Sequence, residues 1–335
     1  MKEKTINIAI FLCIIIIIAM IGFGMYSIFS YEKIEYPQEK LEKEDISIIF
    51  MPSESGYKYI FNLLENAKEE INCALRSLNY DELEELLWKK ESEGVKVRLI
   101  VDKDYAGNKR IYKPFVRFTL GKEGMMHNNY CIIDKDIVMS GSTIFNKNTI
   151  DFNFHDSVII NSSELARKYN SNFWILFENQ TYPNDNPDYI NVGDSTIKVL
   201  FCPYHNCEEE LVNQINKANE KIKFAIYAVT NRVVIDALRN ASKRGVWIEG
   251  TYEKSGITDS SIKYAGIPGV QVDQFNRRVH TKLMIIDENI SITGTLNPSW
   301  RGVTINNENV LIINNPEINN FYEDFIDYIY NFKKI

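Results

Sequence analysis

The chain has 335 residues, of which 45% are hydrophobic and 25% are charged, and its formal net charge is −7. This composition is typical of folded globular proteins and excludes a disordered chain. The length is enough for two domains or two fused halves, and the negative net charge gives no general reason to expect nucleic-acid binding.

The chain begins with an apolar segment followed by a charged one. Residues 6–29 contain no charged side chain, and these 24 positions are enough to cross a bilayer as a helix. We expect an uncleaved, single-pass transmembrane anchor here, because the apolar core is longer than that of a signal peptide. Lysines on both sides leave the orientation undecided, although the short basic N-terminus favours an extracytoplasmic body. Residues 30–45 are rich in charge and are expected to form a linker or helical stalk.

The rest of the chain contains two series of strands and helices in the same order. The pattern predicts strands at 46–50, 71–75, 96–101, 197–201 and 222–228, and helices at 57–70, around 83–87, around 211–218 and at 234–243. An aromatic-rich helix ends each series, at 165–177 and 318–332. This alternation predicts an α/β fold of two fused homologous sandwich halves with mostly parallel sheets, spanning 46–182 and 188–335.

Two segments carry the same polar residues at the same spacing. The first contains His127, Asp134 and Gly141-Ser142, and the second contains His280, Lys282, Asp287 and Gly294-Thr295. In both, Asp follows His by seven positions and Gly follows Asp by seven more. The apolar run after each His predicts a buried strand, and a hairpin at the Asp returns the hydroxyl residue to the level of the His. An imidazole, a cation and a hydroxyl on one patch suit a phosphate group.

This pattern resembles the motif of the phospholipase D superfamily, H-x-K-x4-D followed by G-S/T-x-x-N or a close variant. The second copy matches well in His280, Lys282, Asp287, Gly294 and Thr295, and its Asn297 comes one position earlier than in G-S/T-x-x-N. The first copy departs from it at two positions, because Asn129 stands where the family has lysine and Ile144 stands where the second copy has Asn297. The resemblance covers about residues 46–332.

The resemblance implies a single active site formed by both motifs, with no metal or cofactor. One histidine would attack phosphorus and form a phosphohistidine, while the other would protonate the leaving oxygen and then activate water. We assign the attack to His127 and the acid–base role to His280, and the reverse assignment stays open. Hydrogen-bond donors around the phosphoryl oxygens would replace a metal.

The resemblance also indicates which residues surround the two histidines. Lys282, Ser142, Thr295 and Asn297 are the expected phosphate-binding residues, with Asn129 at the place of the missing lysine. An acidic residue is expected to orient each imidazole: Glu308 for His280 and, less directly, Asp156 for His127. Asp134 and Asp287 are expected to be structural turn residues.

Asn129 is the main departure from the family pattern. An amide donates neutral hydrogen bonds, and charged donors are roughly twice as strong. Loss of one cation would cost roughly 10² to 10³ in rate, by analogy with a lost oxyanion donor. A nearby base such as Arg110 or Lys113 could compensate for it.

The leading functional hypothesis is a membrane-anchored phosphodiesterase that acts on phospholipid. The first alternative is a nuclease for single strands, because basic and aromatic residues alternate between Lys103 and Lys122. The second is a catalytically impaired module that binds phosphate groups, and a transferase that builds a dianionic lipid is a third. Both motifs lie in one chain, so a monomer would suffice.

The five cysteines leave two interpretations open. Cys202 and Cys207 are close enough in sequence for a local disulfide if the body lies outside the cytosol. Free buried or loop thiols are the alternative, and the pattern contains no specific metal-binding signature.

Overall fold

The computed structural model describes residues 39–104, 116–119, 124–183, 187–256 and 262–332. All of them belong to one compact unit, residues 36–335. The expected anchor, residues 6–29, lies outside the described residues. No helix in the described ranges is long and apolar enough to cross a membrane.

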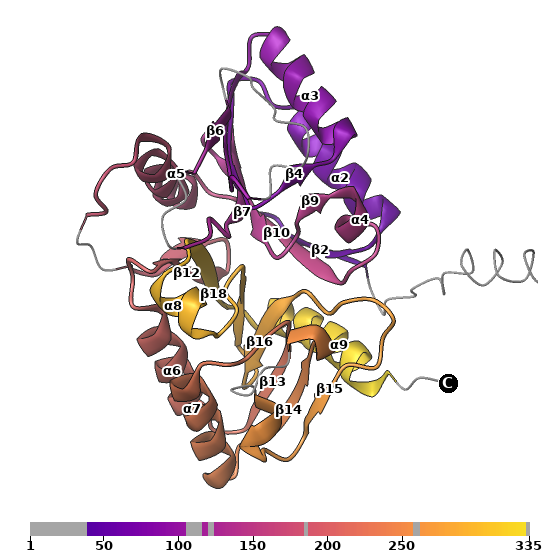
Figure 1. The fold of residues 1–335 in the computed structure, drawn as a ribbon, viewed down its shortest axis with the longest axis vertical. Helices are drawn as coiled ribbons and strands as arrows, with labels where there is room; N and C mark the ends of the chain where they lie inside the picture. Colours follow the sequence, from indigo (N-terminus) through magenta and orange to yellow (C-terminus); the bar gives the residue numbers. More distant parts are fainter. Residues whose placement is uncertain (1–38, 105–115, 120–123, 184–186, 257–261, 333–335) are drawn as a thin grey trace, which may run out of the picture. The chain divides into compact units, whose positions relative to one another are not determined.

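Two eight-stranded sheets form the framework, one in each half of the chain (Figure 1). In spatial order, the first sheet contains β1 (Lys40–Glu42), β2 (Ile46–Met51), β10 (His155–Asn161), β8 (Ile137–Gly141), β7 (Asn129–Ile133), β3 (Glu70–Leu75), β5 (Lys96–Val101) and β6 (Val116–Phe118). The second contains β11 (Ile190–Val192), β12 (Ser195–Cys202), β18 (Glu308–Asn314), β17 (Ile290–Gly294), β16 (Lys282–Ile286), β13 (Lys221–Ile226), β14 (Trp247–Tyr252) and β15 (Val270–Val272). The identical order confirms the duplication.

The expectation of mostly parallel sheets is wrong, because both sheets are mixed. Only the β3–β5–β6 and β13–β14–β15 strands run parallel, and all other neighbours in the two sheets are antiparallel. The motif strands cause this difference. β7 and β8 are joined by a short turn, as are β16 and β17, and a short turn can only join antiparallel strands. The expected hairpins are therefore present, and they decide the sheet type.

The helices cover both sheets. They are α2 (Glu54–Glu65), α3 (Asp81–Ser92), α4 (Lys147–Ile150), α5 (Ser163–Glu178), α6 (Cys207–Lys217), α7 (Arg232–Lys243), α8 (Trp300–Thr304) and α9 (Pro316–Asn331). A short ribbon of β4 (Leu78–Asn79) and β9 (Phe145–Asn146) completes the first half. Helix α7 shows why these segments are helical: Val234, Leu238 and Ala241 recur at helical spacing and are buried, and Asn231 caps the first turn.

The two halves meet through aromatic side chains on equivalent strands. Phe50 of β2 stacks on Phe325 of α9 at 3.8 Å between ring centroids. On the other side, Phe201 of β12 packs edge-on against Tyr169 of α5 at 5.2 Å. Figure 1 shows α2 and α3 together beside the first sheet and α6 and α7 together beside the second. Each half thus has its own core on one face and shares the other face.

Two expected boundaries differ from the structure. Lys40–Glu42, within the predicted linker, forms the edge strand β1 instead. The helix predicted at 57–70 begins at Glu54, where Ser53 caps it, and ends at Glu65. It cannot continue, because the backbone N–H groups of residues 68–70 are bound by the carboxylate of Asp134.

Asp134 and Asp287 have matching structural roles. Asp134 accepts hydrogen bonds from the backbone N–H groups of residues 68–70, and Asp287 accepts them from residues 219–221. Both residues have φ of 52°, a left-handed conformation that Asp and Asn tolerate better than other side chains. The expectation that they are structural turn residues agrees with these contacts.

Asp134→Ala is expected to lower the free energy of unfolding by about 2 to 4 kcal/mol, because three backbone donors lose a charged acceptor. Asp134→Asn keeps the backbone preference and one acceptor oxygen, so its loss should be smaller. Denaturant unfolding measures both, and activity per folded molecule should not change. A tenfold fall in that activity would place Asp134 in the chemistry.

The structure contains two disulfides. Cys73 of β3 is bonded to Cys131 on the neighbouring strand β7, and Cys202 is bonded to Cys207. The sequence left the second pair open and gave no partner for the first. The two loops differ in length, with sequence separations of 58 and 5.

Removing the Cys73–Cys131 bond should destabilise the fold more than removing the Cys202–Cys207 bond. Loop-closure entropy gives about 4 kcal/mol for the longer loop and about 2 kcal/mol for the shorter. Paired Cys→Ala variants test this by denaturant unfolding. A thiol count in denaturant without reductant provides the control: Cys13 alone should react, and reaction of all five cysteines would contradict the assignment.

Candidate active site

Each of the two motif histidines is hydrogen-bonded through its backbone to the opposite half of the chain. The backbone N–H of His127 donates to the carbonyl oxygen of Asn307 at 2.9 Å, and that of His280 donates to the carbonyl oxygen of Phe154 at 3.0 Å. Asn307 and Phe154 immediately precede strands β18 and β10. Each histidine therefore lies beside the first residue of a strand from the other half, and both motifs contribute to one site.

His127 is held by a carboxylate from the second half. Its Nδ1 lies 2.6 Å from Oε2 of Glu308, and the two side chains are 3% and 1% exposed. The other oxygen, Oε1, accepts a hydrogen bond from Nδ2 of Asn306 at 3.1 Å. Because an ionised carboxylate only accepts hydrogen bonds, Nδ1 of His127 carries the proton. The lone pair of the neutral ring is then on Nε2.

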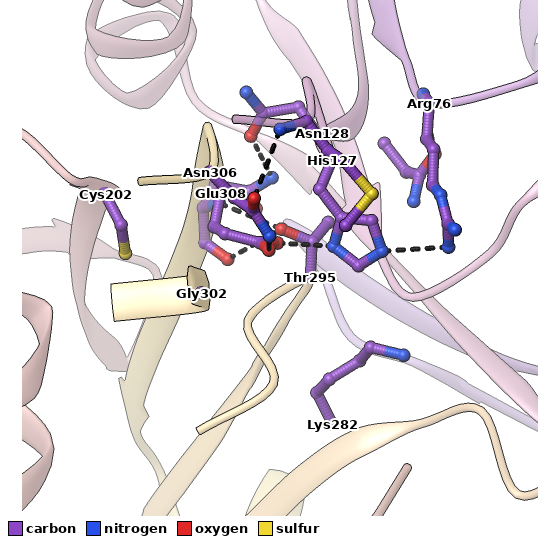
Figure 2. Close-up of polar contacts among 12 residues, drawn as sticks. Arg76, His127, Asn128, Cys202, Lys282, Thr295, Gly302, Asn306 and Glu308 are labelled. Carbon is purple, nitrogen blue, oxygen red and sulfur yellow. Dashed lines mark hydrogen bonds and ion pairs between the residues drawn. The ribbon is translucent and has the colours of Figure 1, made fainter. Parts of the chain in front are cut away.

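The sequence-based pairing of Glu308 with His280 is wrong. Glu308 follows His280 in the same motif, so the sequence suggests that the two belong together. The β-bridge between Met126 and Asn307 brings the start of β18 to His127 instead. Glu308 of the second half therefore binds the histidine of the first half. Figure 2 shows Glu308 and Arg76 on opposite sides of the His127 ring.

Asp156 does not orient either imidazole. Its carboxylate accepts hydrogen bonds from the hydroxyls of Ser142 and Thr293. Burial raises its pKa, and the hydrogen bonds from Ser142 and Thr293 oppose that shift. The expected orienting role is therefore wrong, since the hydroxyls of Ser142, which follows β8, and of Thr293 in β17 occupy its oxygens.

His155 occupies the position opposite His280. It is the first residue of β10, as Glu308 is the first residue of β18, and its ring centroid lies 4.9 Å from that of His280. Its Nδ1 bonds the carbonyl oxygen of Ser142 at 2.9 Å, and burial lowers its pKa to about 3. His280 thus faces a neutral imidazole where His127 faces a carboxylate, and this difference separates the two motifs chemically.

Lys282 lies directly against His280. Its Nζ is 3.1 Å from Nδ1 and 3.3 Å from Nε2 of the ring, and it also bonds the His280 carbonyl oxygen. Burial and then the charge of Lys282 hold the pKa of His280 well below its usual value. Burial also lowers the pKa of Lys282 strongly, while Glu308 opposes that shift. The ligand-free site therefore favours a neutral His280.

Asn129 is buried, and its side chain contacts the backbone of Arg76. Its Oδ1 accepts a hydrogen bond from the backbone N–H of Arg76 at 3.2 Å. The Arg76 side chain, from the segment between β3 and β4, places Nη1 3.0 Å from Nε2 of His127. Arg110 and Lys113, the compensating bases suggested by the sequence, lie outside the described residues. The sequence-based prediction missed Arg76, because it lies outside both motifs and no motif spacing includes it.

The remaining predicted phosphate ligands have different surroundings. Ser142 and Thr295 are fully buried, and their hydroxyl oxygens accept backbone N–H groups of Asp156 and Asn309. They therefore tie β8 to β10 and β17 to β18. Asn297 has a buried amide oxygen that makes no hydrogen bond with any described residue. In the described part of the chain no group of three His, Cys, Asp or Glu side chains could hold a metal ion.

The family model described as "Cardiolipin synthase, PLD-like domain" matches residues 60–176 and 211–330, more than half of the chain. The chain therefore belongs to the phospholipase D superfamily. These two matched segments each contain one motif, so the family relationship covers both halves.

Individual relatives are distant. The chain is 30% identical over 132 residues to a phospholipase D of Rickettsia conorii, covering 38% of this chain and 66% of that protein. It is 23% identical over 145 residues to a mitochondrial cardiolipin hydrolase of Chlamydomonas reinhardtii, covering 41% and 65%. The phosphatidylserine synthase of Haemophilus influenzae has the same fold, with a TM-score of 0.64, 15% identity, and coverage of 87% and 88%.

Proposed function

We propose that the chain is a phospholipase D-type phosphodiesterase that hydrolyses a phosphodiester bond of a phospholipid. The observation that carries this proposal is the state of His127. Glu308 fixes the proton on Nδ1, and Nε2 presents its lone pair beside the guanidinium of Arg76. A nucleophile, an orienting base and a cation for a phosphoryl group are thus in contact.

In the first step, Nε2 of His127 attacks phosphorus and the bond from phosphorus to the leaving oxygen breaks. That oxygen takes a proton from His280. The ligand-free environment keeps His280 neutral, but a bound phosphodiester brings a negative charge to Lys282 and His280. This charge raises the pKa of the imidazole, so substrate binding itself prepares the acid. The positive charge that develops on His127 is offset by Glu308.

In the second step, water attacks phosphorus and gives its proton to His280. The bond between phosphorus and Nε2 breaks, and the phosphate monoester leaves. Both histidines return to their starting protonation states. Asn297 and the two cations are the donors proposed for the phosphoryl oxygens.

Several observations support a lipid substrate at a membrane surface. The relatives named above are a phospholipase D and a cardiolipin hydrolase. A cavity of about 520 Å³ is lined by Met126 and Asn307, which precede His127 and Glu308 in the sequence, and its lining mixes apolar side chains with polar ones that include Arg117, Glu178 and Gln180. This lining suits an amphiphilic molecule. We propose residues 6–29 as the membrane anchor and, because disulfides persist in oxidising compartments, an extracytoplasmic body that acts as a monomer.

A transferase is the second candidate, and the description of the matching family model as a cardiolipin synthase favours it. The same phosphohistidine would then be resolved by an alcohol instead of water. The acceptor enters only in the second step, so the His127 chemistry is common to both reactions.

The test uses the full-length chain in detergent micelles, without added metal. Labelled phosphatidylcholine, phosphatidylglycerol and cardiolipin are compared with a labelled single-stranded oligonucleotide. Release of a phosphate monoester lipid supports the proposal, and transfer to added glycerol supports the synthase alternative. Cleavage of the oligonucleotide alone would make the chain a nuclease. Turnover of none of these substrates would indicate a phosphate-binding module.

A further inference from the structure

Arg76 and Asn129 of the first half lie at the positions that Tyr227 and Lys282 occupy in the second half. The cation is on the other member of the pair in each half. Leu75 pairs with Asn129 in the first sheet, and Ile226 pairs with Lys282 in the second. The next residues, Arg76 and Tyr227, donate their backbone N–H groups to the carbonyl oxygens of Asn128 and Thr281, the residues just before Asn129 and Lys282. Arg76 is therefore the structural counterpart of Tyr227, and Asn129 is that of Lys282.

In the second half, the motif strand provides the cation and the neighbouring strand provides an aromatic ring. Nζ of Lys282 lies 5.6 Å from the centroid of Tyr227. In the first half, the motif strand provides an amide and the neighbouring strand provides the cation. The amide oxygen of Asn129 holds the backbone of Arg76 at 3.2 Å. The positive charge is thus retained in both halves, but it comes from adjacent strands.

The Arg76 side chain reaches the reacting atom. Its Nη1 lies 3.0 Å from Nε2 of His127, the nitrogen that carries the lone pair (Figure 2). Its charge also lowers the pKa of His127, His280 and Lys282, although burial is the largest cause of each shift. The guanidinium therefore contacts His127 directly and lies near enough to His280 and Lys282 for its charge to act on them.

We propose that Arg76 is a phosphate-binding residue that replaces the lysine missing from the first motif. This inference rests on the proposed function of the same site. When phosphorus bonds to Nε2, its non-bridging oxygens lie next to the Arg76 fork, which can donate two parallel hydrogen bonds. An arginine side chain keeps its charge, so it binds the phosphoryl group without taking part in proton transfer.

A strand-to-strand exchange of the cation tests this inference. Arg76→Tyr should lower kcat by roughly 10² to 10³, the effect of losing one oxyanion donor, and should weaken competitive inhibition by inorganic phosphate by about tenfold or more. The double variant Arg76→Tyr with Asn129→Lys gives the first half the residue pair of the second half. Its kcat should be at least tenfold higher than that of Arg76→Tyr alone. Asn129→Lys alone should not raise kcat, since the first half already has its cation in Arg76 and loses the amide oxygen that holds the Arg76 backbone.

Arg76→Gln provides a second, smaller change that keeps hydrogen bonding and removes the charge, and melting temperatures confirm that each variant folds. The inference is overturned if both single variants of Arg76 keep kcat and phosphate inhibition, or if the folded double variant is no better than Arg76→Tyr. Failure of the proposed function has a different signature: the wild-type chain turns over no phosphodiester. Calorimetric titration with inorganic phosphate then tests Arg76 independently, and unchanged affinity in Arg76→Gln overturns the inference.

Discussion

His127→Ala should lower turnover by on the order of 10⁴-fold or more, because it removes the nucleophile itself. His280→Ala should have a similar effect on a natural phospholipid, whose alkoxide leaving group needs an acid. The two variants should differ on a phosphodiester that releases p-nitrophenol, since this leaving group departs without protonation.

With that substrate, His280→Ala should release one equivalent of p-nitrophenol in a burst and then stop. The first step succeeds, but no base remains to activate water. His127→Ala should show no burst, because nothing forms the phosphoenzyme. Stopped-flow absorbance measures both, and the reverse pattern would make His280 the nucleophile.

Glu308→Gln should lower the burst rate by roughly 10² to 10⁴, as expected when an imidazole loses the carboxylate that fixes its tautomer. Burial lowers the pKa of His127 and the charge of Glu308 raises it, so the variant also loses the partner that offsets the imidazolium formed during attack. An amide at position 308 can donate to Nδ1, which would place the proton on Nε2 and block the lone pair.

Asp156→Asn is the matched control for Glu308→Gln. Both carboxylates are buried and both lie at the start of equivalent strands, but Asp156 binds the hydroxyls of Ser142 and Thr293. Its variant should lower the free energy of unfolding and leave the burst rate within about threefold, since the effect is on hydrogen bonds outside the reacting groups. A burst rate lowered by Asp156→Asn and unaffected by Glu308→Gln would contradict the crossed pairing.

The sequence predicted the duplicated halves and the hairpins because these depend on local patterns. Apolar runs bounded by Asp and Gly mark strands wherever they lie in the fold. The direction of neighbouring strands depends on which segments pair, and short apolar runs do not carry that information. Strands β10 and β18 pair antiparallel beside the hairpins, and together with the hairpins they make the sheets mixed instead of mostly parallel.

The sequence was enough to predict the motif residues of the candidate site. It was not enough to predict which residues contact one another across the two halves. Glu308 belongs to the second motif in sequence, yet the backbone bond between His127 and Asn307 places it in the first half of the site. Arg76 lies outside both motifs, 51 positions before His127, so no spacing rule includes it. Only the pairing of β3 with β7 brings its guanidinium to the imidazole.

The most direct measurement is the site of the covalent intermediate. His280→Ala is mixed with a p-nitrophenyl phosphodiester labelled in the phosphoryl group and quenched in base, where the bond between phosphorus and an imidazole nitrogen survives, and the labelled peptide is sequenced by mass spectrometry. The label should be on His127, and it should be absent from the double variant that also carries His127→Ala. A label on another residue of His280→Ala would contradict nucleophilic attack by His127. The absence of any label on His280→Ala, with a substrate that the wild-type chain turns over, would also contradict it.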